Sequence, residues 1–164
     1  MSLDTQIILE RAEHAAAQQT RSAADSSILT VLTFRWGDEV YGLPLLEVSE
    51  VAKVEAITPL PGLQPSLLGA MNLRGEILTV TDPRPLLGLE AGHPSPESRL
   101  IIFPYQCQPV GLLVDVIGDI LTVSRPASLN EASNPIAAQV VLPDGLLLNL
   151  LNLPRILTLL SEES

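Results

Sequence analysis

From residue 28 onward, short apolar runs rich in Val, Ile and Leu alternate with clusters of Gly, Pro, Asn and Asp. Runs of this length, bounded by turn residues, are typical of β-strands. Their close and even spacing indicates a sandwich or barrel rather than a parallel sheet with helical crossovers. The pattern predicts nine strands: Ile28–Phe34, Val40–Leu43, Val51–Ile57, Leu68–Leu73, Glu76–Thr81, Arg99–Phe103, Val110–Val114, Ile120–Val123 and Leu146–Leu150.

Three other segments have helical features. Residues 3–19 carry an Ala-rich apolar stripe at roughly helical spacing. A closing helix is predicted at Asn152–Leu160, where Asn152 is a suitable N-cap and Pro154 falls within the first turn. Between two predicted strands, Leu45–Glu50 is compatible with a single helical turn.

A polar stretch at residues 18–27 separates the N-terminal helix from the strands. The sequence therefore predicts two parts, a helical arm with its linker at residues 1–27 and one β-rich domain at residues 28–160. The arm is either a loosely docked helix or a partner-binding segment. With 164 residues, of which 46% are apolar, the chain is long enough for one domain with a hydrophobic core.

The charge pattern argues against several functions. The net charge is −10, and the nine Lys and Arg residues are scattered without forming a run. Nucleic-acid binding and docking on anionic lipid both need clustered cations, so neither is expected. No apolar stretch approaches the ~20 residues of a membrane-spanning helix. Acids and Gln also interrupt the first residues, unlike a signal peptide, so we expect a cytoplasmic protein.

Residues with catalytic or metal-binding chemistry are few. Cys107 is the only cysteine, and a nucleophilic role would need a nearby base, for which only His14 and His93 are available. The sequence has no HExxH zinc motif, no GxG phosphate or dinucleotide motif and no GxSxG elbow. We therefore expect no cofactor, no metal site and no enzyme activity.

Two pairs of carboxylates remain as candidates for acid–base chemistry. Glu47 and Glu50 would share a face if their segment were helical. Asp115 and Asp119 flank Gly118 near the end of an apolar strand. Either pair could supply an acid and a base, but solvated surface carboxylates of this kind are far more common.

Two segments together resemble a known family. Residues 67–80 form a strand with small residues, an Asn-Leu-Arg-Gly turn and a second apolar strand, followed by Asp82 and Arg84. Residues 111–121 combine an apolar strand with a Val-Asp pair and a second Asp before further apolar residues. In this order and at this spacing, the β-rich domain is similar to the CheW family of chemotaxis coupling proteins.

The resemblance implies a mainly β fold of two small five-stranded SH3-like barrels, with the N-terminal helix and a short C-terminal helix added. It implies a non-catalytic scaffold in two-component signal transduction. Such a scaffold couples the regulatory domain of a CheA-type histidine kinase to the cytoplasmic tip of a methyl-accepting chemoreceptor, and is recruited to membrane-associated receptor arrays that control motility. Its kinase contact would use exposed apolar residues on the barrel built from the later strands. By resemblance, the receptor-binding residues are Val48, Glu50, Gly69, Asn72, Arg74 and Gly75.

Several of these residues have a second interpretation. Arg74 is either an interface arginine or an ordinary solvated turn residue. Gly69 permits either a close approach of another backbone or a β-bulge. Glu50 is either an interface acid or a plain surface residue, and Val48 belongs either to the interface or to the core.

The sequence also departs from the family pattern. The region between Val123 and Leu146 is shorter than usual and lacks an aromatic-glycine stretch. This departure puts the kinase contact in more doubt than the turn at Arg74, and it would also suit a regulator of pilus-based or surface motility that binds only one partner. From other classes, the alternatives are a small-molecule-binding β-barrel and a hydrolase that uses Asp115 and Asp119.

Overall fold

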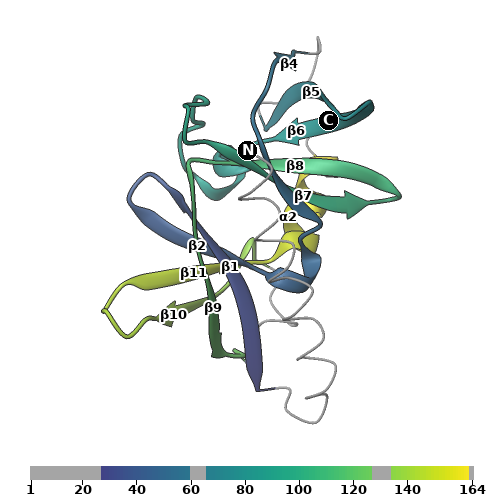
Figure 1. Ribbon diagram of the computed structural model, residues 1–164. Helices are drawn as coiled ribbons and strands as arrows, with labels where there is room; N and C mark the ends of the chain where they lie inside the picture. The colour runs from purple at the N-terminus through teal and green to yellow at the C-terminus, as the bar shows by residue number, and fades with distance from the viewer. Residues whose placement is uncertain (1–26, 60–65, 127–133, 163–164) are drawn as a thin grey trace.

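The computed structural model describes residues 27–59, 66–126 and 134–162, so the helix predicted at residues 3–19 lies outside the described part. In that part, eleven strands form two sheets, accompanied by one α-helix and two short 3-10 helices (Figure 1). The elements in chain order are β1 (Ile28–Trp36), β2 (Glu39–Pro44), η1 (Leu45–Glu47), β3 (Glu50–Lys53), β4 (Ile57–Thr58), β5 (Leu67–Leu73), β6 (Glu76–Thr81), η2 (Arg84–Leu87), β7 (Arg99–Tyr105), β8 (Gln108–Val114), β9 (Val116–Ser124), β10 (Ile136–Val141), β11 (Leu147–Leu151) and α2 (Leu153–Glu162).

The chain crosses between the two sheets twice. Sheet A has the strand order β10-β11-β2-β1-β9, and sheet B has the order β3-β7-β8-β6-β5-β4. The chain leaves sheet A after β2, builds all of sheet B from β3 to β8, and returns to sheet A with β9. In sheet A, β11 pairs in parallel with β2, whereas the other neighbours pair antiparallel.

Both sheets curl on themselves. In sheet B, β3 and β4 are at opposite ends of the strand order, yet only Val54, Glu55 and Ala56 separate them in sequence. Such a short connection cannot span a flat sheet whose neighbouring strands lie about 4.8 Å apart, so the sheet must close. In sheet A, Val123 of β9 and Val140 of β10, from the two outer strands, pack against the same buried cluster.

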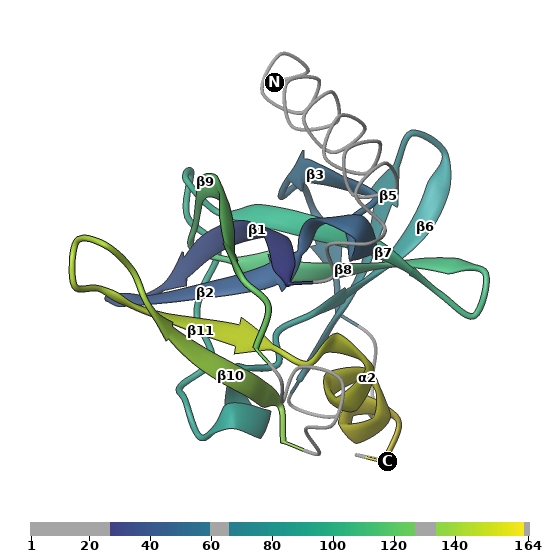
Figure 2. The ribbon, with the colours of Figure 1, turned by 90° about the horizontal axis from the view of Figure 1, so that it is seen from below.

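Alternating side chains fill three apolar clusters. In β1, Val31 lies inside sheet A, whereas Phe34 and Trp36 lie in a cluster between the sheets. In β8, Leu113 lies inside sheet B, whereas Leu112 faces the cluster between the sheets. Buried residues of α2 complete the cluster between the sheets. Figure 2 shows this helix directly after β11. The two barrels are therefore joined through a shared core.

The expected mainly β fold of two curled sheets with a short C-terminal helix is confirmed. Sheet B has six strands rather than five because the two-residue strand β4 pairs with β5. Asn152 caps α2 as predicted, since its side-chain oxygen accepts a hydrogen bond from the backbone N–H of Arg155 at 3.2 Å. Pro154 lies in the first turn of that helix.

Two predictions near the first crossing hold only in part. The helical turn expected at Leu45–Glu50 contains only Leu45–Glu47, because Glu50 already pairs with Ile102 in sheet B. The strand expected at Val51–Ile57 is two strands, since the chain moves there from the edge of β7 to the edge of β5. Closure of sheet B explains both differences.

Two further differences concern the later strands. Gly118 was predicted near a turn, but it lies inside β9, which begins at Val116. A Cβ at Gly118 would lie 2.5 Å from Oγ1 of Thr33, so the glycine permits close pairing with β1. The strand Ile136–Val141 was not predicted at all, because its Ala and Gln residues are weak strand formers.

Candidate functional site

The β5–β6 hairpin ends in the two-residue turn Arg74-Gly75, with Leu73 paired to Glu76 beside it. Both turn residues have positive φ, 50° at Arg74 and 88° at Gly75, as a type I′ hairpin turn requires. The side-chain oxygen of Asn72 accepts a hydrogen bond from the backbone N–H of Gly75 at 3.0 Å. Asn72 and Gly75 therefore shape the turn that presents Arg74.

Arg74 occupies this turn at an energetic cost. The left-handed conformation costs a residue with a side chain about 1–2 kcal/mol. Its Nη2 donates to Oε2 of Glu50 at 2.6 Å, while 62% of the Arg74 side chain remains exposed. Exposed ion pairs contribute only about 0–1 kcal/mol. The guanidinium thus points outward, and its ion pair with Glu50 does not fully offset the free-energy cost of the left-handed backbone.

Carboxylates flank Arg74 from two strands. The hydrogen bond and the charge of Glu50 raise the pKa of Arg74 above its ordinary value, and Glu76 contributes a smaller attraction. Glu50 begins β3, and the closure of sheet B brings it to the end of β5. The result is a permanent cation anchored on one side and open to solvent on the other.

Val48 lies near this pair in sequence but packs against the apolar cluster between the sheets. The contacts of Val48 therefore fit the interpretation that this residue belongs to the core. Two exposed apolar residues that sequence analysis missed are Leu46 in η1 and Ile77 in β6. Ile77 is the cross-strand partner of Asn72 and is 66% exposed. The exposure of Ile77 was predictable from strand alternation, because successive side chains face opposite sides and Leu78 faces the inside of the sheet.

Gly69 is buried in β5 and combines both features considered for it. The register of β5 on β6 shifts between Leu67 and Gly69, which is the irregularity of a bulge. Its φ is 144°, and a Cβ built there would lie 2.1 Å from the carbonyl oxygen of Thr58. The close backbone approach is thus to β4 of the same chain, and Gly69 shapes the strand that leads to Arg74.

The structure does not bring either carboxylate pair together as an acid–base couple. Glu47 lies partly buried in η1. Glu50 lies on β3, and its carboxylate is paired with Arg74. The carboxylate of Asp115 accepts hydrogen bonds from Arg84 and from the backbone of the β1–β2 turn. Asp119 is exposed, and its backbone carbonyl accepts a hydrogen bond from Thr33. The hydrolase alternative therefore has no geometric support in these pairs.

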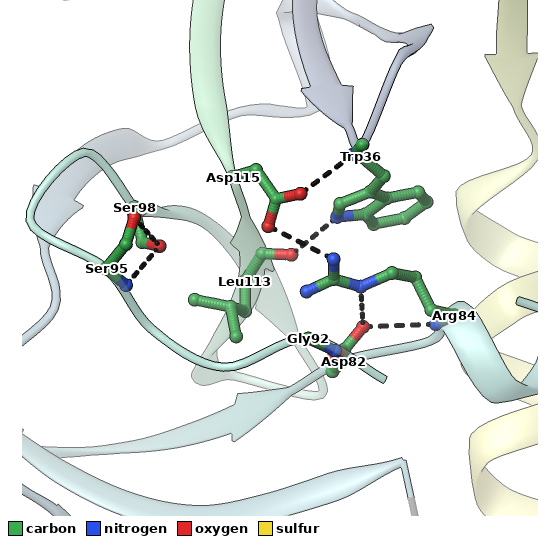
Figure 3. A network of polar contacts seen from close by, with 9 residues as sticks. Trp36, Asp82, Arg84, Gly92, Ser95, Ser98, Leu113 and Asp115 are labelled. Atoms are coloured by element: carbon green, nitrogen blue, oxygen red, sulfur yellow. Dashed lines mark hydrogen bonds and ion pairs between the residues drawn. The ribbon is translucent and has the colours of Figure 1, made fainter. Parts of the chain in front are cut away.

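Asp82 and Arg84 form a second polar site, which is buried (Figure 3). Nε of Arg84 donates to Oδ1 of Asp82 at 2.8 Å. Burial lowers the pKa of Arg84, but its hydrogen bonds and charge interactions with Asp82 and Asp115 raise it more, so the net direction is upward. In the sequence, Asp82 and Arg84 stand out only as part of a family pattern, which does not predict the contact of Arg84 with Asp115.

The remaining candidate groups are dispersed. Cys107 is exposed in the β7–β8 turn, and His93 is exposed between η2 and β7. Within the described ranges, three or more His, Cys, Asp or Glu side chains never gather in a way that could hold a metal ion. No helix in that part of the chain is long and apolar enough to cross a membrane.

Glu47→Gln should stabilise the fold at neutral pH. Burial raises the pKa of the Glu47 carboxyl, whose Oε1 has no hydrogen-bond partner among the described residues. A raised carboxyl pKa means that the ionised form is disfavoured by folding, so stability is lost as the pH rises through the folded pKa. Gln avoids this loss.

Urea denaturation at two pH values checks this prediction. The variant should be more stable than the wild type at pH 7. The difference should disappear at about pH 3.5, below the ordinary Glu pKa of about 4.3. An equal or lower free energy of unfolding for the variant at pH 7 would contradict the assignment of a buried, unpaired carboxylate.

Comparisons with known proteins agree with the architecture. The chemotaxis protein CheW of Rhizobium meliloti (strain 1021) is 36% identical over 94 residues, which cover 57% of this chain and 61% of that protein. The chemotaxis protein CheW of Bacillus subtilis (strain 168) is 29% identical over 140 residues, covering 82% and 90%. The chain therefore spans less than two thirds of the first relative and most of the second.

A solved structure and a family model also match this chain. The crystal structure of scaffolding protein TtCheW from Thermoanaerobacter tengcongensis matches with a TM-score of 0.63 and 26% identity, covering 75% of this chain and 88% of that one. Proteins of this kind are scaffolds without catalytic activity, in agreement with the expectation from the sequence. The model of the CheW-like domain matches residues 30–161, from β1 to α2, and the chain therefore belongs to the CheW-like domain family.

Proposed function

We propose that this chain couples a CheA-type histidine kinase to the cytoplasmic tip of a methyl-accepting chemoreceptor, and that the Arg74 turn contacts the receptor. The observation that carries the proposal is the exposed, left-handed Arg74 anchored by Glu50. Its conformation costs more than an exposed ion pair returns, and strain of this kind concentrates at functional positions. The coupler acts in the cytoplasm, next to the membrane in which its receptor is anchored.

The chemistry of the turn suits the polar end of a helical hairpin. A guanidinium presents five N–H donors in a rigid plane, and one nitrogen of Arg74 is bonded to Glu50. Its exposed donors suit a carboxylate or backbone carbonyls of a partner. Exposed Ile77, which pairs with Asn72 beside the turn, offers apolar area for an amphipathic helix. Asn72, Gly75 and the buried Gly69 support this surface by shaping the hairpin.

A second surface is needed for the kinase, and we place it on sheet A. Val141 of β10 and Leu147 of β11 are cross-strand partners with exposed side chains, and Val141 is 71% exposed. Exposed branched apolar pairs of this kind suit a protein partner. They belong to the sheet that contains the later strands, whereas Arg74 belongs to sheet B. The two partners would therefore bind different barrels.

Arg74→Glu should weaken binding to a cytoplasmic fragment of the cognate receptor by at least ~2 kcal/mol, roughly 30-fold. The substitution removes the donors and adds a carboxylate beside Glu50 and Glu76. Isothermal titration calorimetry measures the affinity. The free energy of unfolding should change by about 1 kcal/mol or less, because the lost ion pair is exposed.

Arg35→Glu is the matched control. Arg35 is exposed on β1 of sheet A, and the substitution changes the net charge by the same amount. It should leave the receptor affinity unchanged. An unaltered affinity in Arg74→Glu would remove Arg74 from the receptor site, and an equal loss in both variants would assign the effect to net charge alone.

The alternative within the family is a regulator that binds one partner and competes with the true coupler. A pull-down with the cognate kinase regulatory domain and the receptor fragment separates the two functions. Capture of both partners supports coupling. Capture of one alone supports the competing regulator, whether its output is flagellar or pilus-based motility.

A further inference from the structure

The contact between the two sheets contains a polar cluster with a buried centre, which we call the inter-sheet joint. It consists of Trp36, Gly37, Asp82, Arg84 and Asp115 (Figure 3). Asp82 is fully buried, and Arg84 is nearly so. None of these residues belongs to the surface proposed for the receptor or for the kinase, so the proposed function does not yet give the joint a role.

The sheet B half of the joint holds the Arg84 guanidinium in one place. Oδ1 of Asp82 accepts hydrogen bonds from Nε of Arg84 at 2.8 Å and from its backbone N–H at 3.2 Å. Oδ2 of Asp82 accepts one from the backbone N–H of Gly92 at 3.0 Å. A Cβ at Gly92 would lie 2.3 Å from Nη2 of Arg84, so the loop closes over the cation only because this residue is glycine.

Asp115 links this half to sheet A, at the point where the chain passes from β8 to β9. Its Oδ1 accepts a hydrogen bond from Nη1 of Arg84 at 3.1 Å, and its Oδ2 accepts one from the backbone N–H of Gly37 at 2.8 Å. Beside this link, Nε1 of Trp36 donates to the carbonyl of Leu113 at 2.8 Å. The backbone N–H of Asp115 also donates to the carbonyl of Arg35 in β1 at 3.0 Å, so three polar contacts tie the end of the β1–β2 hairpin to sheet B.

Stability alone does not explain why the joint is polar. Nη2 of Arg84 is buried without a partner among the described residues. Well-packed apolar residues often stabilise a core as much as a buried ion pair, or more. The apolar cluster between the sheets holds them together without directional preference. Hydrogen bonds instead define a distance and an angle, so what the joint adds is one orientation of the two sheets.

We infer that the connection from Arg84 through Asp115 to Gly37 sets the angle between the two sheets, with Arg84 and Asp115 as positioning residues. The consequence for an adaptor rests on the proposed function. Arg74 lies on sheet B, and the pair of Val141 and Leu147 lies on sheet A. A fixed angle between the sheets would then determine how the receptor and the kinase are placed relative to each other.

The orientation can be measured in the isolated protein with two spin labels. Cys107, the single cysteine of the chain, is exposed in the β7–β8 turn of sheet B and takes one label. Asp144→Cys places the second label in the exposed β10–β11 turn of sheet A. Double electron–electron resonance then gives the distribution of distances between the labels. Asp115→Ala removes the side-chain link from Arg84 to Gly37 but keeps the pair of Asp82 and Arg84 and the backbone hydrogen bond from Asp115 to Arg35, and it should shift or broaden this distribution.

Three comparison variants make the result specific. Asp119→Ala removes an exposed carboxylate from β9, and Leu150→Ala opens a cavity in the cluster inside sheet A, to which no residue of the joint belongs. Both should keep the wild-type distribution. Asp115→Asn retains one carbonyl acceptor and should give an intermediate change.

An unchanged distribution in Asp115→Ala would overturn the inference. The same change in Leu150→Ala would also overturn it, because a general loss of stability would then suffice to explain the effect. No partner is present in this measurement. Its outcome is therefore independent of whether Arg74 binds a receptor.

Discussion

Gly69→Ala should lower the free energy of unfolding by about 2–6 kcal/mol, the sum of two effects. A φ of 144° is rarely adopted by residues with side chains, and such backbone strain costs about 1–3 kcal/mol. The added Cβ would also lie 2.1 Å from the carbonyl oxygen of Thr58. Because that neighbour is backbone, no rotamer change relieves the contact, and moving β4 costs about 1–3 kcal/mol more.

Gly145→Ala is the control that separates these two effects. Gly145 has a φ of 89°, but a Cβ there would meet nothing within 4 Å. Its substitution should cost about 1–2 kcal/mol from the backbone alone. Urea denaturation measures both variants. Equal losses would show that the approach of Thr58 contributes nothing and that Gly69 is required only for its φ.

Asp82→Ala should lower the free energy of unfolding by about 3–5 kcal/mol, because it leaves the buried Arg84 cation without its main partner. Three donors lose their acceptor in this variant, namely Nε of Arg84, the backbone N–H of Arg84 and the backbone N–H of Gly92. Asp115 still contacts Arg84, but that carboxylate is partly exposed and is shared with Gly37. Urea denaturation at neutral pH gives the magnitude.

Two comparisons test the cause of this loss. Asp38→Ala removes an exposed carboxylate from the β1–β2 turn and should change stability by about 0.5 kcal/mol or less. The double variant Asp82→Ala with Arg84→Met removes both partners of the buried pair. It should be more stable than Asp82→Ala alone, because no uncompensated charge remains. A double variant without this recovery would show that the lost hydrogen bonds to Gly92 and the backbone dominate.

The parts of the fold that were predictable are those whose own residues determine their structure. The strands at Arg99–Tyr105 and Gln108–Val114 are mostly apolar along their length and were found with small errors at their ends. The strand at Ile136–Val141 has Ile and Val only at its ends, and Ala and Gln between them hide the pattern that its pairing with β11 reveals. Gly118 was misplaced for a similar reason, since only the contact with Thr33 shows that it lies inside a strand.

The candidate site shows the same division. The turn at Arg74 was predictable because the residues that form it are consecutive, from Asn72 to Gly75. Glu50 was named as a site residue, but its ion pair with Arg74 depends on the closure of sheet B. The contact between Arg84 and Asp115 joins residues 31 positions apart, and no local pattern predicts it. Asp115 was therefore interpreted as a possible catalytic acid, whereas its contacts are structural.

The double crossing of the chain has a consequence for how the protein is made. All strands of sheet B come from residues 50–114, whereas sheet A needs β1, β2 and three strands made after residue 115. Domains generally begin to fold while the rest of the chain is still being synthesised. Sheet B can thus assemble on the ribosome while β2 has no neighbour on one side, because its partner β11 does not yet exist. The nascent chain exposes this open strand edge until β11 has been synthesised, and an open edge is a site for aggregation.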